Sequence, residues 1–134
     1  MKLSSKTITA IKMFVDLGEH YQEGFISLKD IAERKELSKK FLEQIVPQYK
    51  ASGLLIGNRG NQGGYKLAKN PKNIHLKDII YILETDLNKD ITGFSALDEV
   101  IEKADDMLAN YFSEITLAYL VEKQKETYSY NYSI

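Results

Sequence analysis

Cysteine is absent from this 134-residue chain. That absence excludes disulfides, thiolate nucleophiles, and zinc or iron–sulfur sites ligated by cysteine. Only two histidines are present, so histidine ligands are a poor substitute for such a site. No apolar run approaches the roughly 18 residues needed to cross a bilayer, and the N-terminus has no signal-peptide core. We therefore expect a cytoplasmic protein with no metal, no cofactor and no membrane association.

Signatures of catalysis are also missing. The sequence contains no nucleophile elbow, no cluster of metal ligands and no convincing pair of acids. The adjacent acids Asp98-Glu99 and Asp105-Asp106 diverge around a helix, which is typical of a solvated face. The sequence therefore predicts a protein that is not an enzyme.

Charge is unevenly distributed, although the net charge is only −1. Residues 1–70 hold 12 Lys and Arg against 7 Asp and Glu, whereas residues 71–134 hold 6 against 12. A basic N-terminal half followed by an acidic C-terminal half indicates that the first half meets a polyanion and the second meets something else. Chance scatter is the alternative.

Three amphipathic segments open the chain, at residues 6–21, 27–35 and 38–52. Serine can cap the start of each predicted helix, with Ser5, Ser27 and Ser38 in the cap positions. The second and third segments have the lengths of a helix-turn-helix pair, with the turn at Glu36-Leu37. Pro47 is expected to kink or shorten the third helix, because it removes the hydrogen bond to the Glu43 carbonyl.

A glycine-rich stretch, residues 59–65, follows the helix pair and lies between short apolar runs at 54–56 and 65–67. The runs predict two strands joined by a tight hairpin, after a helix end at Gly53. Arg59 beside the tip can enter a narrow minor groove, which attracts cations. Helix pair and hairpin together predict a winged helix-turn-helix fold that binds DNA. An ordinary hairpin turn stays open, as does a nucleotide-binding loop, although no Gly-Lys-Ser/Thr follows.

In a helix-turn-helix, the first turns of the second helix contact bases and phosphates in the major groove. Lysines near the helix N-terminus suit phosphates, while a glutamate can accept from cytosine and a glutamine can pair with adenine. The candidate DNA-contacting residues are Ser27, Lys29, Ser38, Lys39, Lys40, Phe41, Glu43, Gln44, Arg59, Asn61 and Gln62. A solvated helix face without a partner is the alternative for the helix residues.

The acidic half is expected to hold a short helix at residues 76–84 and a longer helix capped by Ser95. Apolar residues recur in the longer helix at intervals of three and four residues. This stripe predicts a symmetric dimer seam, formed by Leu97, Val100, Ile101, Ala104, Met107, Leu108 and Tyr111. An intramolecular core is the alternative. One more short helix is expected at residues 117–121.

These elements divide the chain into four expected parts: a winged helix-turn-helix domain at residues 1–85, a linker at 86–94, a dimerisation region at 95–126 and an aromatic tail at 127–134. The fold class expected is mainly α, with a small β-hairpin wing and a long C-terminal dimerisation helix.

Several of these segments, in this order, resemble the Rrf2 family of bacterial winged-helix regulators: residues 1–4, 27–34, 41–44, 59–67 and 74–84. The resemblance covers about the first 85 residues, and the long helix fits the family's dimerisation helix. It implies a homodimer that binds imperfect palindromes in double-stranded DNA, usually as a repressor. It also implies base reading by Ser38, Phe41, Glu43 and Gln44, with Arg59 as the minor-groove arginine. Pro47 departs from the family pattern.

Many family members sense iron–sulfur clusters through three cysteines before the dimerisation helix, and residues 88–106 contain none. The resemblance is therefore to cysteine-free members, which include a repressor of cysteine metabolism that acts with O-acetylserine thiol-lyase. A free carboxylate on an apolar residue can be captured by backbone donors. We therefore expect Tyr132, Ser133 and Ile134 to dock into such an enzyme. A frayed end, or a strand packed on the dimer, is the alternative.

Two classes of function remain. The first is a homodimeric, sequence-specific DNA-binding repressor that does not sense through a cysteine-ligated cluster. The alternative is a winged-helix protein-interaction module that acts through a partner such as O-acetylserine thiol-lyase. Salt dependence separates them, because DNA binding that neutralises several phosphates weakens steeply with salt.

Overall fold

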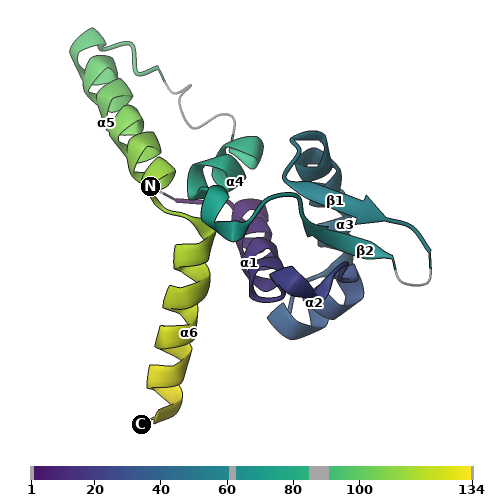
Figure 1. Cartoon of the computed structure of the whole chain (residues 1–134). Helices are drawn as coiled ribbons and strands as arrows, with labels where there is room; N and C mark the ends of the chain where they lie inside the picture. Colours follow the sequence, from purple (N-terminus) through teal and green to yellow (C-terminus); the bar gives the residue numbers. More distant parts are fainter. Residues whose placement is uncertain (1, 61–62, 85–90, 134) are drawn as a thin grey trace.

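The structure, a computed structural model, describes residues 2–60, 63–84 and 91–133, which are mainly helical with one small hairpin (Figure 1). In chain order the elements are α1 (Ser5–Glu19), η1 (Tyr21–Glu23), α2 (Leu28–Lys35), α3 (Lys39–Ala51), β1 (Leu55–Asn58), β2 (Gly64–Leu67), η2 (Pro71–Asn73), α4 (Leu76–Leu83), α5 (Ser95–Glu114) and α6 (Leu117–Ser133). The predicted fold class, mainly α with a β-hairpin wing, is confirmed. Within the described ranges, no helix is long and apolar enough to span a membrane.

Serine side chains cap the first three helices. Ser4 caps α1, one residue earlier than predicted, and its Oγ accepts the Thr7 N–H at 3.3 Å. Ser27 and Ser38 cap α2 and α3 as predicted, each accepting the N–H three residues later at 3.1 and 3.2 Å. Such a cap stabilises a helix by about 1 kcal/mol. The caps therefore fix where both helices of the pair begin.

The helix α3 continues through Pro47 to Ala51, so the expectation that proline shortens it is wrong. Proline cannot donate to the Glu43 carbonyl. Both residues are exposed, however, so water can bind that carbonyl at little cost.

The end of α3 has the glycine cap that the sequence predicts. Gly53 has φ 84°, and its N–H donates to the Lys50 carbonyl at 3.1 Å. The Leu54 N–H donates to the Tyr49 carbonyl at the same distance, which completes a Schellman motif. The chain thereby reverses directly into β1, which pairs antiparallel with β2.

The core forms where α1, α3 and α4 meet. The rings of Phe14 and Tyr49 pack edge to face with centroids 4.9 Å apart. The buried Tyr49 phenol donates to the Ile79 carbonyl at 2.8 Å, which ties α3 to α4. Burial raises the pKa of Tyr49, so this donor stays protonated. Other fully buried members are Met13, Leu17, Ile31, Leu42, Ile45 and Ile74.

Two long helices, α5 and α6, leave this body in roughly opposite directions from one junction (Figure 1). The junction is held by two backbone hydrogen bonds of 2.8 Å: Leu76 N–H donates to the Ile115 carbonyl, and Leu117 N–H donates to the Ile74 carbonyl. From there α6 packs along α1, and α5 contacts α4. The two helices α5 and α6, called the arms below, are therefore both anchored at the start of α4.

Two sequence expectations about these arms are wrong. Ser95 is the first residue of α5 instead of its cap; the cap position is Phe94, and the Asp98 carboxylate accepts the Thr92 N–H at 2.8 Å. The backbone of α6 is helical from Leu117 to Ser133, where a short helix at residues 117–121 and a separate aromatic tail were expected. Local ion pairs such as Lys125–Glu122, at 3.6 Å, support the helix beyond Val121, where its buried apolar positions end.

Candidate nucleic-acid interface

The turn between α2 and α3 is tight. Glu36, which ends α2, adopts a left-handed conformation with φ 55°, and its N–H donates to the Ala32 carbonyl. The Leu37 N–H donates to the same carbonyl at 2.9 Å. This geometry places the start of α3 immediately after α2, as a helix-turn-helix requires.

The predicted reading residues of α3 fall on two faces. Ser38, Lys39, Lys40, Glu43 and Gln44 are exposed on one surface of the helix. Phe41 is half-buried and packs against the core, so only part of its ring is accessible. On the preceding helix, Lys29 is exposed and Ser27 is half-buried in its capping role. The exposed set offers cations, a carboxylate and an amide within two helical turns.

The exposed face of α3 carries charges of both signs. Lys39 Nζ lies 3.8 Å from Glu43 Oε1, one turn along the helix. An exposed pair of this kind contributes little to stability, so either side chain can exchange its partner for a phosphate or a base.

Lys50 is a further cation that the sequence reasoning missed. Its Nζ lies 3.2 Å from the position that a Cβ on Gly57 would occupy, so the amine lies over β1 at the base of the hairpin. A signal was present, because Lys50 follows Lys39 by about three helical turns on one face of α3.

The hairpin presents Asn58, Arg59 and Gly60 to solvent. Two other predicted contacts, Asn61 and Gln62, lie outside the described residues. The turn is closed by the Gly63 N–H, which donates to the Gly60 carbonyl at 2.9 Å. Arg59 therefore follows β1 directly and extends from the edge of a closed hairpin.

The hairpin is fastened to the start of α2. Ile26 and Tyr65 exchange two backbone hydrogen bonds, of 2.9 and 2.8 Å, which form an isolated antiparallel bridge beside β2. Gly64 permits this contact: its φ is 155°, and a Cβ there would lie 2.3 Å from the Ile26 carbonyl oxygen. On the same side Lys66 Nζ lies 4.7 Å from the centre of the Phe25 ring. Hairpin and helix pair therefore form one unit.

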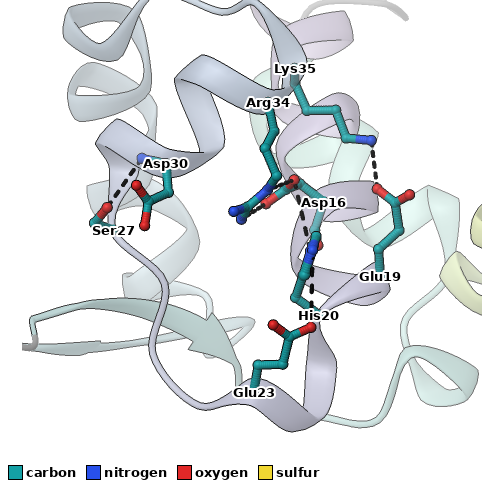
Figure 2. Close-up of polar contacts among 8 residues, drawn as sticks. All are labelled: Asp16, Glu19, His20, Glu23, Ser27, Asp30, Arg34 and Lys35. Carbon is teal, nitrogen blue, oxygen red and sulfur yellow. Dashed lines mark hydrogen bonds and ion pairs between the residues drawn. The ribbon is translucent and has the colours of Figure 1, made fainter.

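Behind the helix pair, a charged clamp joins α1 to α2 (Figure 2). The buried Asp16 carboxylate accepts from Arg34 Nε at 2.9 Å and from Nη2 at 2.8 Å. These hydrogen bonds raise the pKa of Arg34 above its ordinary value. Lys35 Nζ lies 2.5 Å from Glu19 Oε1 in the same cluster. Because the Asp16 carboxylate is buried, loss of Arg34 would leave its charge without a partner, so the clamp helps to set the angle between the two helices.

His20 completes the end of α1. Its Nδ1 lies 2.8 Å from the Asp16 carbonyl oxygen, and a carbonyl can only accept, so Nδ1 carries the proton. The ring thus satisfies a helix-terminal carbonyl. Across the described part of the chain, no group of three or more potential metal-ligating side chains gathers.

The predicted dimerisation residues divide between two faces of α5. Ile101 and Leu108 are half-buried on the side that carries the buried Phe112, whose ring lies 6.4 Å from Tyr81 of α4. The others are exposed: Leu97, Val100, Ala104, Met107 and Tyr111. One face therefore packs against the body and another apolar face is open. In the tail, the backbone at Tyr132 and Ser133 belongs to α6, and Ile134 lies outside the described residues.

Comparison with known proteins gives a consistent match. The family model described as "Rrf2: Iron-dependent Transcriptional regulator" matches residues 3–123. IscR of Photorhabdus laumondii is 30% identical over 134 residues, which cover 93% of this chain and 82% of that protein. CymR of Bacillus subtilis is 39% identical over 84 residues, which cover 63% of this chain and 61% of that protein. Protein rrf2 of Nitratidesulfovibrio vulgaris is 34% identical over 84 residues, which cover 63% of this chain and 56% of that protein. The match thus spans less than two thirds of some curated relatives.

Solved structures agree over most of the chain. IscR of T. potens superposes with a TM-score of 0.81 at 38% identity, covering 95% of this chain and 90% of that one. CymR of B. subtilis, described as a global cysteine regulator, superposes with a TM-score of 0.80 at 30% identity, covering 92% of this chain and 98% of that one. These relatives are transcription regulators, not enzymes.

Proposed function

Because this chain belongs to the Rrf2 family of DNA-binding transcription regulators, we propose that it works as a homodimeric, sequence-specific repressor of the cytoplasm. The family resemblance and the non-enzymatic class that the sequence predicts are both confirmed. The observation that carries the proposal is the junction of hairpin and helix pair. The bridge between Ile26 and Tyr65 fastens the wing to the start of α2, and β1 contacts α3, so helix pair and wing would act as one reading head.

In the proposed complex, α3 of each copy enters the major groove. Glu43 and Gln44 reach base edges, while Lys39 and Lys40 meet phosphates beside the helix N-terminus. Arg59 of the wing enters the adjacent minor groove, and Lys50 lies close enough to the hairpin base to meet the backbone between them. Residues 1–85 would form the reading unit and the arms would form the dimer.

The proposed signal is not a cluster held by cysteine, because these 134 residues contain no cysteine. The family model's printed description is iron-dependent, so this chain would depart from it in its sensing chemistry. A partner enzyme such as O-acetylserine thiol-lyase, bound through Tyr132, Ser133 and Ile134, is a second proposal. It is supported by the likeness to CymR, described as a cysteine regulator. Deleting the last four residues and measuring enzyme binding by calorimetry tests it, and unchanged affinity contradicts it.

The main proposal is tested by incubating the purified protein with random double-stranded DNA at moderate salt and sequencing what it retains. We expect an enriched inverted repeat, because two reading heads related by a two-fold axis select two half-sites. Retention without sequence enrichment, or no retention, would favour a protein-interaction role. A reporter gene placed behind the enriched sequence then separates repression from activation.

A further inference from the structure

A pocket of about 520 Å³ lies where α6 passes the end of α1. Three segments that are distant in the sequence form its walls: residues 18–23 at the end of α1 and in η1, residues 70–72 at η2, and α6. A Cβ on Gly18 would lie 2.9 Å from Val121 Cγ2, so α6 rests directly on α1 beside the pocket. The volume falls in the range of small-molecule sites, about 300–1,000 Å³.

The wall formed by α1 and η1 offers acceptors and negative charge. The carbonyls of Gly18 and Glu19 accept no backbone hydrogen bond within the described residues, and the last turn of α1 has no basic residue to offset its negative end. Glu23 Oε2 lies 4.0 Å from His20 Nε2, but Nδ1 of that ring carries the proton, so the neutral ring cannot donate to Glu23. This wall therefore suits a cationic group that donates hydrogen bonds.

The wall formed by η2 has the opposite character. Lys72 is exposed, and among the described residues no carboxylate lies within ion-pair distance of its amine. The Asn70 Oδ1 accepts the Lys72 backbone N–H at 2.9 Å, which leaves the side-chain amide nitrogen of Asn70 as a donor. This wall therefore suits a carboxylate.

The other charged side chains of the pocket are already paired. Glu19 is paired with Lys35, and Glu122 lies 3.6 Å from Lys125, both of them exposed. Apart from the Gln22 amide, the remaining lining is apolar: Tyr21, Pro71, Ala118 and Val121. The pocket thus combines one carboxylate and one amine that lack a charged partner with an apolar surface between them.

We propose that this pocket binds a free α-amino acid with an apolar side chain, as an effector of the regulator. The ammonium group of the ligand donates to Glu23 and to the carbonyls at the end of α1, and its carboxylate accepts from Lys72 and Asn70. The ligand side chain packs on the apolar lining. A ligand with only one charge would leave one wall without a partner, so the pocket selects a zwitterion. Binding itself needs neither DNA nor a dimer, whereas the effector role rests on the function proposed above.

The two charged walls are also the two connections between the reading head and the rest of the chain. The segment η1 leads to Ile26, which bridges to Tyr65, and η2 follows β2 of the wing. An amino acid held between Glu23 and Lys72 fixes the separation of these connections and, through α6, their position relative to that arm. The bound ligand then changes DNA affinity, and DNA changes ligand affinity by the same factor.

Calorimetry of the purified wild-type chain with each common L-amino acid, at millimolar concentration, tests the site without DNA. We expect an amino acid with an apolar side chain to bind, and its N-acetyl and carboxamide derivatives to bind at least about tenfold more weakly, since each lacks one charge. Lys72→Gln and Glu23→Gln should each weaken binding by a similar factor. Lys69→Gln and Glu33→Gln, exposed outside the pocket, are the matched controls and should leave the affinity unchanged.

Failure of every amino acid to bind, or equal binding of both derivatives, overturns the site and leaves the proposed DNA-binding regulator intact. Affinity that survives both Lys72→Gln and Glu23→Gln does the same, because the ligand then lies elsewhere. The amino acid that binds should change the affinity of the wild-type chain for its selected DNA site by at least about fivefold, measured by anisotropy. An unchanged DNA affinity overturns the effector role, and a chain that binds the amino acid but no DNA overturns the proposed regulator instead.

Discussion

Arg59 is the exposed cation that the wing places closest to the expected minor groove. It follows β1 directly and is exposed beside a turn that the Gly63 N–H closes on the Gly60 carbonyl. Its contribution should be electrostatic and independent of base sequence.

We predict that Arg59→Ala weakens binding to all DNA sequences and lowers the slope of log affinity against log salt by about one unit. Anisotropy titrations with a labelled duplex between low and moderate salt measure the slope. Lys123→Ala removes a cation from α6 and serves as the control. An unchanged slope for Arg59→Ala would remove the wing from the interface.

Glu84 holds the end of α4 to the start of α1. Its Oε1 accepts the Ser4 N–H at 2.8 Å and the Thr7 hydroxyl at 2.6 Å. Hydrogen bonding from Ser4, and then from Thr7, holds the pKa of Glu84 below its ordinary value. A carboxyl with a lowered folded-state pKa contributes stability above its unfolded pKa and loses it as pH falls through the folded pKa.

We therefore predict that Glu84→Gln lowers the free energy of unfolding by about 1 kcal/mol at pH 7, since the group is partly exposed. The difference from wild type should shrink as the pH falls through the acidic range. Urea unfolding at a series of pH values measures both. Glu33→Gln, exposed on α2, controls for net charge. A difference that stays constant with pH would contradict the assignment.

At the scale of elements, the contact between hairpin and helix pair depends on Gly64. A Cβ at this position would lie 2.3 Å from the Ile26 carbonyl oxygen, so the bridge that fastens β2 to the start of α2 must open.

We predict that Gly64→Ala destabilises the fold by at least about 2 kcal/mol, because a steric clash adds to the strain of a positive φ. Affinity for DNA should fall more than tenfold, while the mass of the dimer at low temperature stays unchanged. Gly60→Ala is the matched control in the same hairpin: its φ is also positive, 112°, but the space around it is open. Equal effects of both substitutions on DNA affinity would show that the bridge does not orient the wing.

Local signals account for what the sequence predicted well. Ser27 and Ser38 cap their helices through the N–H three residues later, and Gly53 ends α3, because each motif needs only neighbouring residues. The order of helices and hairpin followed from such signals. The shortening predicted at Pro47 does not occur, since a proline on an exposed helix face costs less free energy than one whose freed carbonyl is buried.

Contacts between distant residues could not be predicted in the same way. Asp16 and Arg34 are 18 residues apart, and Ile26 and Tyr65 are 39 apart, with no local pattern that pairs them. The apolar stripe of α5 predicted a dimerisation helix, but it did not predict which apolar residues pack within the chain. That Ile101 and Leu108 face inward depends on the position of α4. The helix at the end of the chain was not predicted, because its aromatic and polar residues alternate and lack a helical apolar period. Local ion pairs support that helix instead.

At the scale of the whole molecule, α5 needs a partner for its open face. We predict that Val100→Asp raises the dimer dissociation constant by at least about 100-fold, because it places an unpaired charge in an apolar seam. Sedimentation at several concentrations measures it. Asn110→Asp adds the same charge on the polar face and should have little effect. A dimer that survives Val100→Asp would place the interface elsewhere.

The central proposal is that two reading heads, joined by the arms, read two half-sites of one DNA molecule. The most direct measurement compares affinity for the selected site with affinity for the same site carrying about 5 bp, half a helical turn, between its half-sites. If the protein binds as a dimer, affinity for the spaced site should fall by at least about tenfold, because the second reading head then faces the wrong side of the duplex. Equal affinity for both sites would contradict it and mean that each reading head binds alone.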